Sequence, residues 1–192
     1  MAWRTLKDLP KFNERKATQA AVLLLKRFNA PIEYLKLIKL LYIVERRAIM
    51  RWGSLFTCDR LVSMDNGPVL SQTYGLIQEG RRPEMVSYWA RFITPPSNYK
   101  VRLTETEIPE AEDVLSAAEK ELLNEVFEEF GSLPPWELVD ITHTLPEWRN
   151  PFGSAIPIKY STLLKEAGKS DEQIRKIRGD WADSAWVDDN LT

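Results

Sequence analysis

The chain has 192 residues and a formal net charge of −2, with 44% hydrophobic and 28% charged residues, a composition typical of an ordinary globular protein of about one domain. Its longest apolar run, residues 20–25, is too short to span a bilayer, and we expect neither a membrane segment nor a signal peptide. The single cysteine, Cys58, excludes an intrachain disulfide and favours a cytoplasmic location.

The first quarter of the chain predicts two helices. Asn13 can cap a helix that runs to about residue 29, because its side chain can accept from a free backbone N–H. The pair Ala30-Pro31 ends it, since proline disfavours helical backbone in the residue before it. A second helix is predicted at about 32–52, stopped by Gly53. Its first half is apolar on almost all sides, which indicates burial at the centre of the fold.

The next segment is predicted to be irregular over residues 54–66, apart from a short extended piece at 60–64. The sequence Gly67-Pro68-Val69 predicts a turn that redirects the chain, because glycine reaches positive φ and proline fixes φ behind it. Ser71 can then cap a short helix that Gly80 ends.

Residues 88–93 and 99–103 alternate in character around Thr94-Pro95-Pro96-Ser97-Asn98, which predicts a small β-hairpin. The rest is predicted to be helical except for an extended piece at 156–160. The expected helices are 111–130, followed by Gly131; 134–145, capped by Ser132; 161–167; and 170–187, opened by a capping box of Ser170 and Gln173. The predicted fold class is therefore mainly α, a single compact helical domain with a small β-hairpin. We divide it into a domain at 1–155 and a C-terminal helical extension at 156–192.

Charge is unevenly distributed along the chain. Residues 1–51 hold twelve Lys/Arg against four Asp/Glu, and residues 104–130 hold ten Asp/Glu against one Lys. Two interpretations stay open: the blocks bind partners of opposite charge, or they are solvated helix surfaces that face each other or water.

Catalytic and metal chemistry finds little support in the sequence. His143 is the only histidine and Cys58 the only cysteine, so a zinc site built from several such ligands is excluded. The two could form a nucleophile and its base, although a buried thiol and a histidine that bonds backbone explain them more simply. No phosphate-binding or dinucleotide fingerprint occurs. We predict no enzyme, no metal and no cofactor, and keep a Cys58–His143 hydrolase as the less favoured alternative.

A DNA-binding regulator is the other alternative. The first two predicted helices are basic and are joined by a short turn, as in a helix-turn-helix. The second helix is too apolar to lie in a groove, however, and the pI of about 5.6 is low for a nucleic-acid binder. Two tryptophans of the acidic C-terminal part, Trp181 and Trp186, are interpreted either as core residues or as anchors of a protein interface.

Several short pieces recur in an order and spacing that resemble one known family. They are Lys39-Leu40-Leu41-Tyr42 with Arg46, Gly53, Asp59-Arg60, Gly67-Pro68-Val69, Tyr74, Trp89, Phe130-Gly131, residues 138–143 and Trp148. Together they resemble the Panacea domain, the SocA-like antitoxin family of bacteria and their phages.

The resemblance implies an antitoxin of a toxin–antitoxin system, possessing no known catalytic residues, which neutralises a small cognate toxin by direct contact. Some members act as adaptors that deliver the toxin to a protease, and a role in phage defence is expected. The candidate motif and partner-binding residues are Lys39, Tyr42, Arg46, Asp59, Gly67, Pro68, Val69, Tyr74, His143, Trp148, Trp181 and Trp186. We expect Gly67 at positive φ. We also expect Lys39, Tyr42 and Arg46 on one side of the central helix, with Asp59 or Asp65 as the acidic partner of Arg46.

Overall fold

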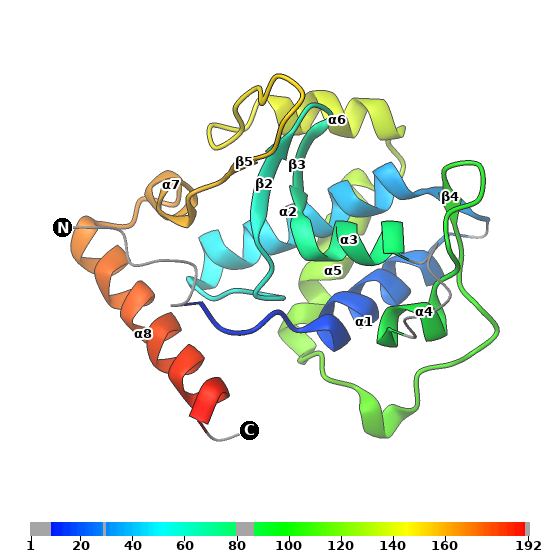
Figure 1. The fold of residues 1–192 in the computed structure, drawn as a ribbon, viewed down its shortest axis with the longest axis horizontal. Helices are drawn as coiled ribbons and strands as arrows, with labels where there is room; N and C mark the ends of the chain where they lie inside the picture. Colours follow the sequence, from blue (N-terminus) through cyan, green and yellow to red (C-terminus); the bar gives the residue numbers. More distant parts are fainter. Residues whose placement is uncertain (1–8, 29, 80–86, 191–192) are drawn as a thin grey trace.

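The computed structural model describes residues 9–28, 30–79 and 87–190 and is mainly α-helical (Figure 1). The helices of these residues are α1 (Glu14–Lys26), α2 (Tyr34–Trp52), α3 (Ser71–Glu79), α4 (Tyr88–Phe92), α5 (Ala117–Phe130), α6 (Pro135–His143), α7 (Tyr160–Glu166) and α8 (Asp171–Asn190), with a 3₁₀ turn at Glu110–Glu112. The strands are β1 (Ile32–Glu33), β2 (Leu61–Met64), β3 (Gly67–Leu70), β4 (Lys100–Val101) and β5 (Ile156–Pro157).

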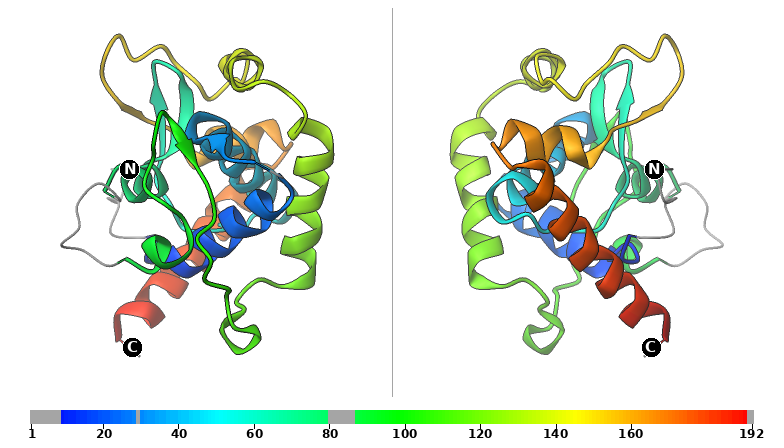
Figure 2. Two further views of the ribbon diagram at one scale, coloured as in Figure 1. Left: turned by 90° about the vertical axis from the view of Figure 1, so that its right-hand side faces the viewer. Right: turned by 90° about the vertical axis from the view of Figure 1, so that its left-hand side faces the viewer.

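Helix α2 is the central element, as its apolar sequence predicts. It contacts α1, α5, α6, α7 and β3, and Figures 1 and 2 show it surrounded by these elements. Gly53 ends the helix in the left-handed conformation, with φ of 68°, and its N–H donates to the Ile49 carbonyl. The Asn13 cap of α1 is also confirmed, since the side chain accepts from the Lys16 N–H.

The sequence Gly67-Pro68-Val69 forms strand β3 rather than the predicted turn. Residues 65 and 66 make the turn instead, and β3 pairs antiparallel with β2, which pairs on its other edge with β5. Pro68 is tolerated because β3 is an edge strand, where a missing N–H donor breaks no ladder. The expected positive φ of Gly67 is confirmed at 89°.

The hairpin predicted at 88–103 is confirmed only over residues 93–103, and the strand predicted for residues 88–92 is wrong. Residues 88–92 form helix α4, whose N-terminus the Ser87 side chain caps by accepting from the Ala90 N–H. Trp89 and Phe92 are both buried, and their spacing of three is that of one helix face. Strand β4 pairs with β1. The expected pairing is kept by two isolated antiparallel bridges, Ile93 with Leu103 and Ser97 with Lys100, and by the Thr94 N–H, which donates to the Arg102 carbonyl at 2.9 Å.

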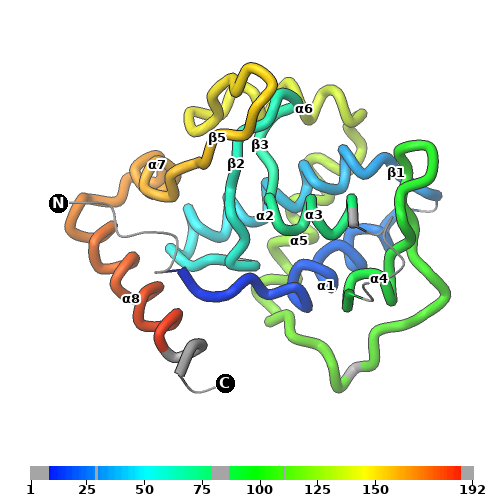
Figure 3. The backbone as a smooth tube through the Cα atoms, viewed as in Figure 1, coloured from blue at the N-terminus to red at the C-terminus, as the bar shows by residue number. Residues whose placement is uncertain are grey.

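Side-chain caps open helices α5 and α8, whereas α6 and α7 begin without one. Helix α5 starts later than predicted, behind a capping box of Ser116 and Glu119, and residues 102–116 form a long connection before it (Figure 3). Ser132 does not cap α6, whose N-cap is Pro134. The capping box of Ser170 and Gln173 at α8 is confirmed. The Gly80 stop lies outside the described residues.

Residues 156–190 contact the rest of the fold through strand pairing, helix packing and one tryptophan. Strand β5 pairs with β2, and α7 packs on α2. Trp181 of α8 is buried, donates from Nε1 to the Gly53 carbonyl at 3.0 Å and contacts the Tyr160 ring edge-on. The division at residue 155 stays a prediction.

The two charge blocks face each other. Acidic side chains of α5 pair with basic side chains of α1 and α2: Lys16 with Glu119, Arg27 with Glu128, Arg47 with Glu129 and Arg51 with Glu125. These four pairs agree with the second of the two sequence interpretations. A DNA-binding helix pair would need these basic side chains of α1 and α2 on a free surface, but here they pair with acids of α5. Helix α2 itself is largely buried. In the described part of the chain, no helix has the length and apolarity needed to cross a bilayer.

Candidate functional site

Three side chains of α2 project toward α6 and the segment after it. The Tyr42 hydroxyl donates to Glu147 Oε1 at 2.9 Å, and Arg46 Nε donates to the same oxygen at 2.8 Å. The spacings of three and four from Lys39 to Tyr42 and Arg46 place them on one helix face, as expected. The prediction that Asp59 or Asp65 pairs with Arg46 is wrong, because the acidic partner of Arg46 is Glu147.

The two acids predicted for Arg46 have other contacts. Both Asp59 carboxylate oxygens accept from the chain around the start of α3, including the N–H and hydroxyl of Thr73 at 2.7 Å. Asp65 Oδ1 accepts from the Gly153 N–H at 2.9 Å. Burial raises the pKa of Asp59, and the hydrogen bonds from Thr73, Gln72 and Arg60 oppose this rise.

Lys39 is fully buried and donates from Nζ to the Pro68 carbonyl at 2.8 Å. Loss of hydration disfavours the charged form and lowers its pKa from 10.5 to about 7. Gly67 lies directly beside it: a Cβ added there would meet Thr142 Oγ1 at 2.7 Å and Lys39 Nζ at 2.9 Å. Glycine is therefore required at this position by space as well as by its positive φ.

His143 and Trp148 hold the tip of the β2–β3 hairpin. Their rings stack with centroids 4.0 Å apart. His143 Nε2 lies 3.1 Å from the Asp65 carbonyl, and Trp148 Nε1 donates to the Met64 carbonyl at 3.1 Å. The hairpin tip is thus attached both to α6 and to the segment that follows α6.

These contacts bring seven of the predicted residues together with one that was missed. We call this set the α2–α6 polar cluster: Lys39, Tyr42, Arg46, Gly67, Pro68, His143, Glu147 and Trp148. Glu147 is the only acid between residues 141 and 155, and this could have identified it. The cluster contains charged groups that are mostly bound to each other or to backbone.

The remaining predicted residues lie elsewhere. Val69 is buried in β3. Tyr74 contacts the Tyr34 ring. Asp59 and Trp181 lie near the C-terminal end of α2, where Tyr160 donates to the Asp59 carbonyl at 2.6 Å. Trp181 is a core residue, whereas Trp186 is 62% exposed.

Another buried acid, Glu45, was not anticipated from the sequence. Its carboxylate accepts from the N–H groups of Phe56 and Thr57 at 2.8 Å and from the Thr57 hydroxyl at 2.6 Å. Burial raises its pKa from 4.5 to about 7, against the effect of these hydrogen bonds. The sequence signal that could have identified Glu45 as a buried acid is its position within the apolar part of α2.

The proposed nucleophile and base are not assembled. Cys58 precedes β2, whereas His143 contacts Asp65, which follows β2. The four residues of this strand extend over about 10 Å. Among the described residues, no three His, Cys, Asp or Glu side chains gather as metal ligands would.

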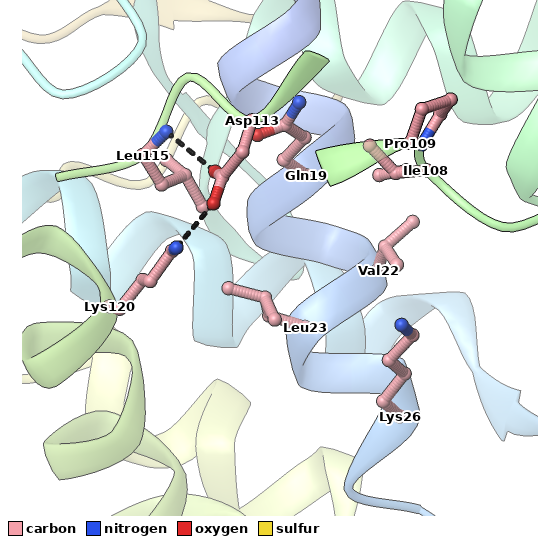
Figure 4. Close-up of a pocket in the computed structure, with 9 residues that line it drawn as sticks. All are labelled: Gln19, Val22, Leu23, Lys26, Ile108, Pro109, Asp113, Leu115 and Lys120. Atoms are coloured by element: carbon pink, nitrogen blue, oxygen red, sulfur yellow. Dashed lines mark hydrogen bonds and ion pairs between the residues drawn. The ribbon is translucent and has the colours of Figure 1, made fainter. Parts of the chain in front are cut away.

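A cavity of about 150 Å³ lies between α1 and the connection that precedes α5 (Figure 4). This is small beside ligand pockets of about 300–1,000 Å³. Its polar groups bond to neighbouring chain: Asp113 accepts from Lys120 and from the Leu115 N–H, and Gln19 bonds the Glu112 carbonyl and the Val114 N–H. The cavity therefore offers few free polar groups to a ligand.

A family model described as antitoxin SocA-like, Panacea domain, matches residues 37–149. The chain belongs to this family. The matched Panacea domain begins within α2 and ends just after Trp148, so it contains the whole α2–α6 polar cluster. Membership assigns a general antitoxin role. Neither the curated proteins nor the solved structures contained a match to the chain.

Proposed function

We propose that this Panacea-domain protein is an antitoxin that neutralises a small cognate toxin by forming a stable complex with it. The observation that carries the proposal is the family match over residues 37–149. The arrangement of the candidate residues supports it, because the motif side chains bond to one another inside the fold. Such a site suits a scaffold that binds a protein better than it suits catalysis.

The α2–α6 polar cluster has a structural part in this proposal. Arg46 and Tyr42 connect α2 to Glu147, and His143 and Trp148 connect α6 and its following segment to the hairpin tip. The cluster thereby holds three surface elements in fixed relative positions. Preorganised surfaces bind with a smaller loss of conformational entropy.

The test is co-expression with the product of the adjacent open reading frame. We expect that product to stop growth when expressed alone, growth to recover when this chain is present, and the two proteins to co-purify. The proposal is wrong if the neighbouring product is harmless, or if it stays toxic and does not co-purify. Salt-dependent binding to duplex DNA without binding to that product would favour the DNA-binding regulator.

Neutralisation by delivery to a protease is the second form that the family allows, and it makes a different prediction. Delivery lowers the amount of toxin in the cell, whereas occlusion leaves the toxin at full level within the complex. Toxin abundance measured in the presence and absence of cytoplasmic proteases separates the two. We place the complex in the cytoplasm, in line with the single cysteine, and infer a contribution to phage defence.

A further inference from the structure

Helix α6 presents an acidic and aromatic side to solvent. Leu138, Val139 and Thr142 are buried against the fold, while Trp136, Glu137 and Asp140 are exposed. Trp136 is 62% exposed, although its large apolar ring is costly to leave in water. Exposed aromatic side chains of this kind are typical anchors of protein interfaces.

The segment after α6 presents a second aromatic side chain, Phe152, which is 88% exposed. Its φ is +49° and that of the next residue, Gly153, is +82°. Hydrogen bonds hold this backbone: the Phe152 N–H donates to Asn150 Oδ1 at 2.9 Å, and the Gly153 N–H donates to Asp65 Oδ1 at 2.9 Å. The ring is therefore held in solvent by an anchored backbone.

The two aromatic side chains belong to elements that lie at the same edge of the molecule (Figures 1 and 2). Asp65 contacts Gly153 through its carboxylate and His143 through its carbonyl, so the hairpin tip bridges the segment and the end of α6. From His143 to Trp136 the helix extends about 10 Å. Figures 1 and 2 both show α6, the hairpin tip and the segment at the same edge of the molecule. We call the surface of Trp136, Glu137, Asp140, Asp65 and Phe152 the α6 surface.

The charge of the α6 surface indicates the kind of partner. Three of its five residues are acidic and exposed, and the exposed basic residue Arg149 comes three positions before Phe152 in the chain. Four of the five acids of α5 differ, because basic side chains of α1 and α2 pair with them within the chain. Among the described residues, the ion pairs do not include Glu137 or Asp140. A basic surface would complement these carboxylates, and apolar recesses in it would remove Trp136 and Phe152 from water.

We infer that the α6 surface binds the cognate toxin through a basic face of the toxin that has apolar recesses for Trp136 and Phe152. This inference rests on the proposed antitoxin function and adds the contact surface and the chemistry of the partner. The acidic residues increase the association rate and make it dependent on salt, while the two aromatic side chains slow dissociation.

The test measures binding of the purified adjacent gene product to the full chain and to variants. We expect Trp136→Ala and Phe152→Ala each to raise Kd at least tenfold, mostly through faster dissociation. Glu137→Gln with Asp140→Asn should slow association and weaken its dependence on salt. Tyr99→Ala is the matched control, because this aromatic side chain is 71% exposed but lies outside the α6 surface. The control should leave Kd unchanged.

The outcomes separate this inference from the function on which it rests. If the wild-type chain binds the product and Trp136→Ala and Phe152→Ala bind equally well, the antitoxin function stands and the α6 surface is wrong. If the wild-type chain does not bind the product, both the antitoxin function and the α6 surface as its binding site are wrong. If the wild-type chain is a dimer that these two variants make monomeric, a second copy of the chain occupies the surface and the inference is overturned. Unchanged thermal unfolding of the variants verifies that each is folded.

Discussion

Arg46 Nε lies 2.8 Å from Glu147 Oε1, although the two residues are 101 positions apart in the chain. The contact joins the central helix α2 to the segment after α6, and the Glu147 side chain is fully buried. Its Oε2 has no hydrogen-bond partner within the described residues. A buried carboxylate is costly to desolvate, so the contacts of Oε1 with Arg46 and Tyr42 are essential to keep it there.

We expect Glu147→Leu to lower the free energy of unfolding by about 3 kcal/mol or more, because it leaves the Arg46 guanidinium mostly buried without its partner. The double variant Arg46→Met with Glu147→Leu should lose less than the single variant does, since it removes both charges. Urea unfolding of the wild-type chain, Glu147→Leu, Arg46→Met and the double variant gives the coupling energy. Equal stability of Glu147→Leu and the wild-type chain would contradict a role for the pair.

Gly67→Ala should destabilise the fold by about 2 kcal/mol or more through two effects, positive φ and the short contacts of its Cβ with Thr142 and Lys39. Gly67→Val should be at least as costly. Alanine substitutions at two other glycines separate the cost of positive φ from the cost of the short Cβ contacts. Gly168 has a φ of +74° but open space around a Cβ, and Gly179 lies in α8 with open space as well.

Gly168→Ala should therefore cost only about 1 kcal/mol of backbone strain, and Gly179→Ala should raise stability by about 0.5–1 kcal/mol because alanine favours helix. Midpoints of thermal unfolding rank the three alanine variants. If Gly67→Ala costs no more than Gly168→Ala, the contacts with Thr142 and Lys39 are not tight in solution.

Lys39 makes stability depend on pH above neutrality. Burial lowers its pKa from 10.5 to about 7 in the folded protein, so between these values the unfolded chain binds the proton and the folded chain does not. The contribution to stability therefore rises with pH over this window and is lost as pH falls through about 7. Lys39→Met should flatten this dependence, which urea unfolding between pH 6.5 and about 10 measures.

Ionisation of Glu45 makes the stability of the fold fall as pH rises, which is the opposite of the effect of Lys39 and occurs at lower pH. Its pKa rises from 4.5 to about 7 on folding, so the folded chain binds a proton that the unfolded chain has released. The stabilising contribution is present below about 4.5 and is lost as pH rises to about 7. Glu45→Gln should remove this fall in stability, which the same unfolding series between pH 4.5 and 7 measures. An unchanged slope would show that the three donors from residues 56 and 57 keep Glu45 ionised.

The two C-terminal tryptophans should respond differently to truncation. Trp181→Ala removes a buried ring that bonds Gly53 and packs on Tyr160, and we expect a loss of about 3–5 kcal/mol. Trp186→Ala should change stability by less than about 1 kcal/mol, because the side chain is mostly exposed. Chemical denaturation decides this prediction, and similar losses for both variants would mean that Trp186 also docks on the core in solution.

Local signals in the sequence were sufficient to predict most of the helices and the residues at which several of them begin or end. The Asn13 cap, the Gly53 stop and the Ser170 capping box follow from bonds between residues a few positions apart, and the positive φ of Gly67 follows from its own lack of a side chain. Local signals were not sufficient for the first strand of the hairpin predicted at 88–103, because residues 88–92 form helix α4. Trp89 and Phe92 fit a short helix face as well as an alternating pattern, and packing against α1 selects the helix.

The sequence by itself determined a mainly helical protein with an apolar central helix and the order of motifs that marks the Panacea domain. Its single cysteine and single histidine also excluded a zinc site built from several such ligands. Only the tertiary structure decided which acid Arg46 pairs with, that α5 neutralises the basic faces of α1 and α2, and that Trp181 rather than Trp186 is buried. These are choices among residues far apart in the chain. Their outcome depends on which surfaces the packing of α2 brings together, and composition and periodicity carry no information about that.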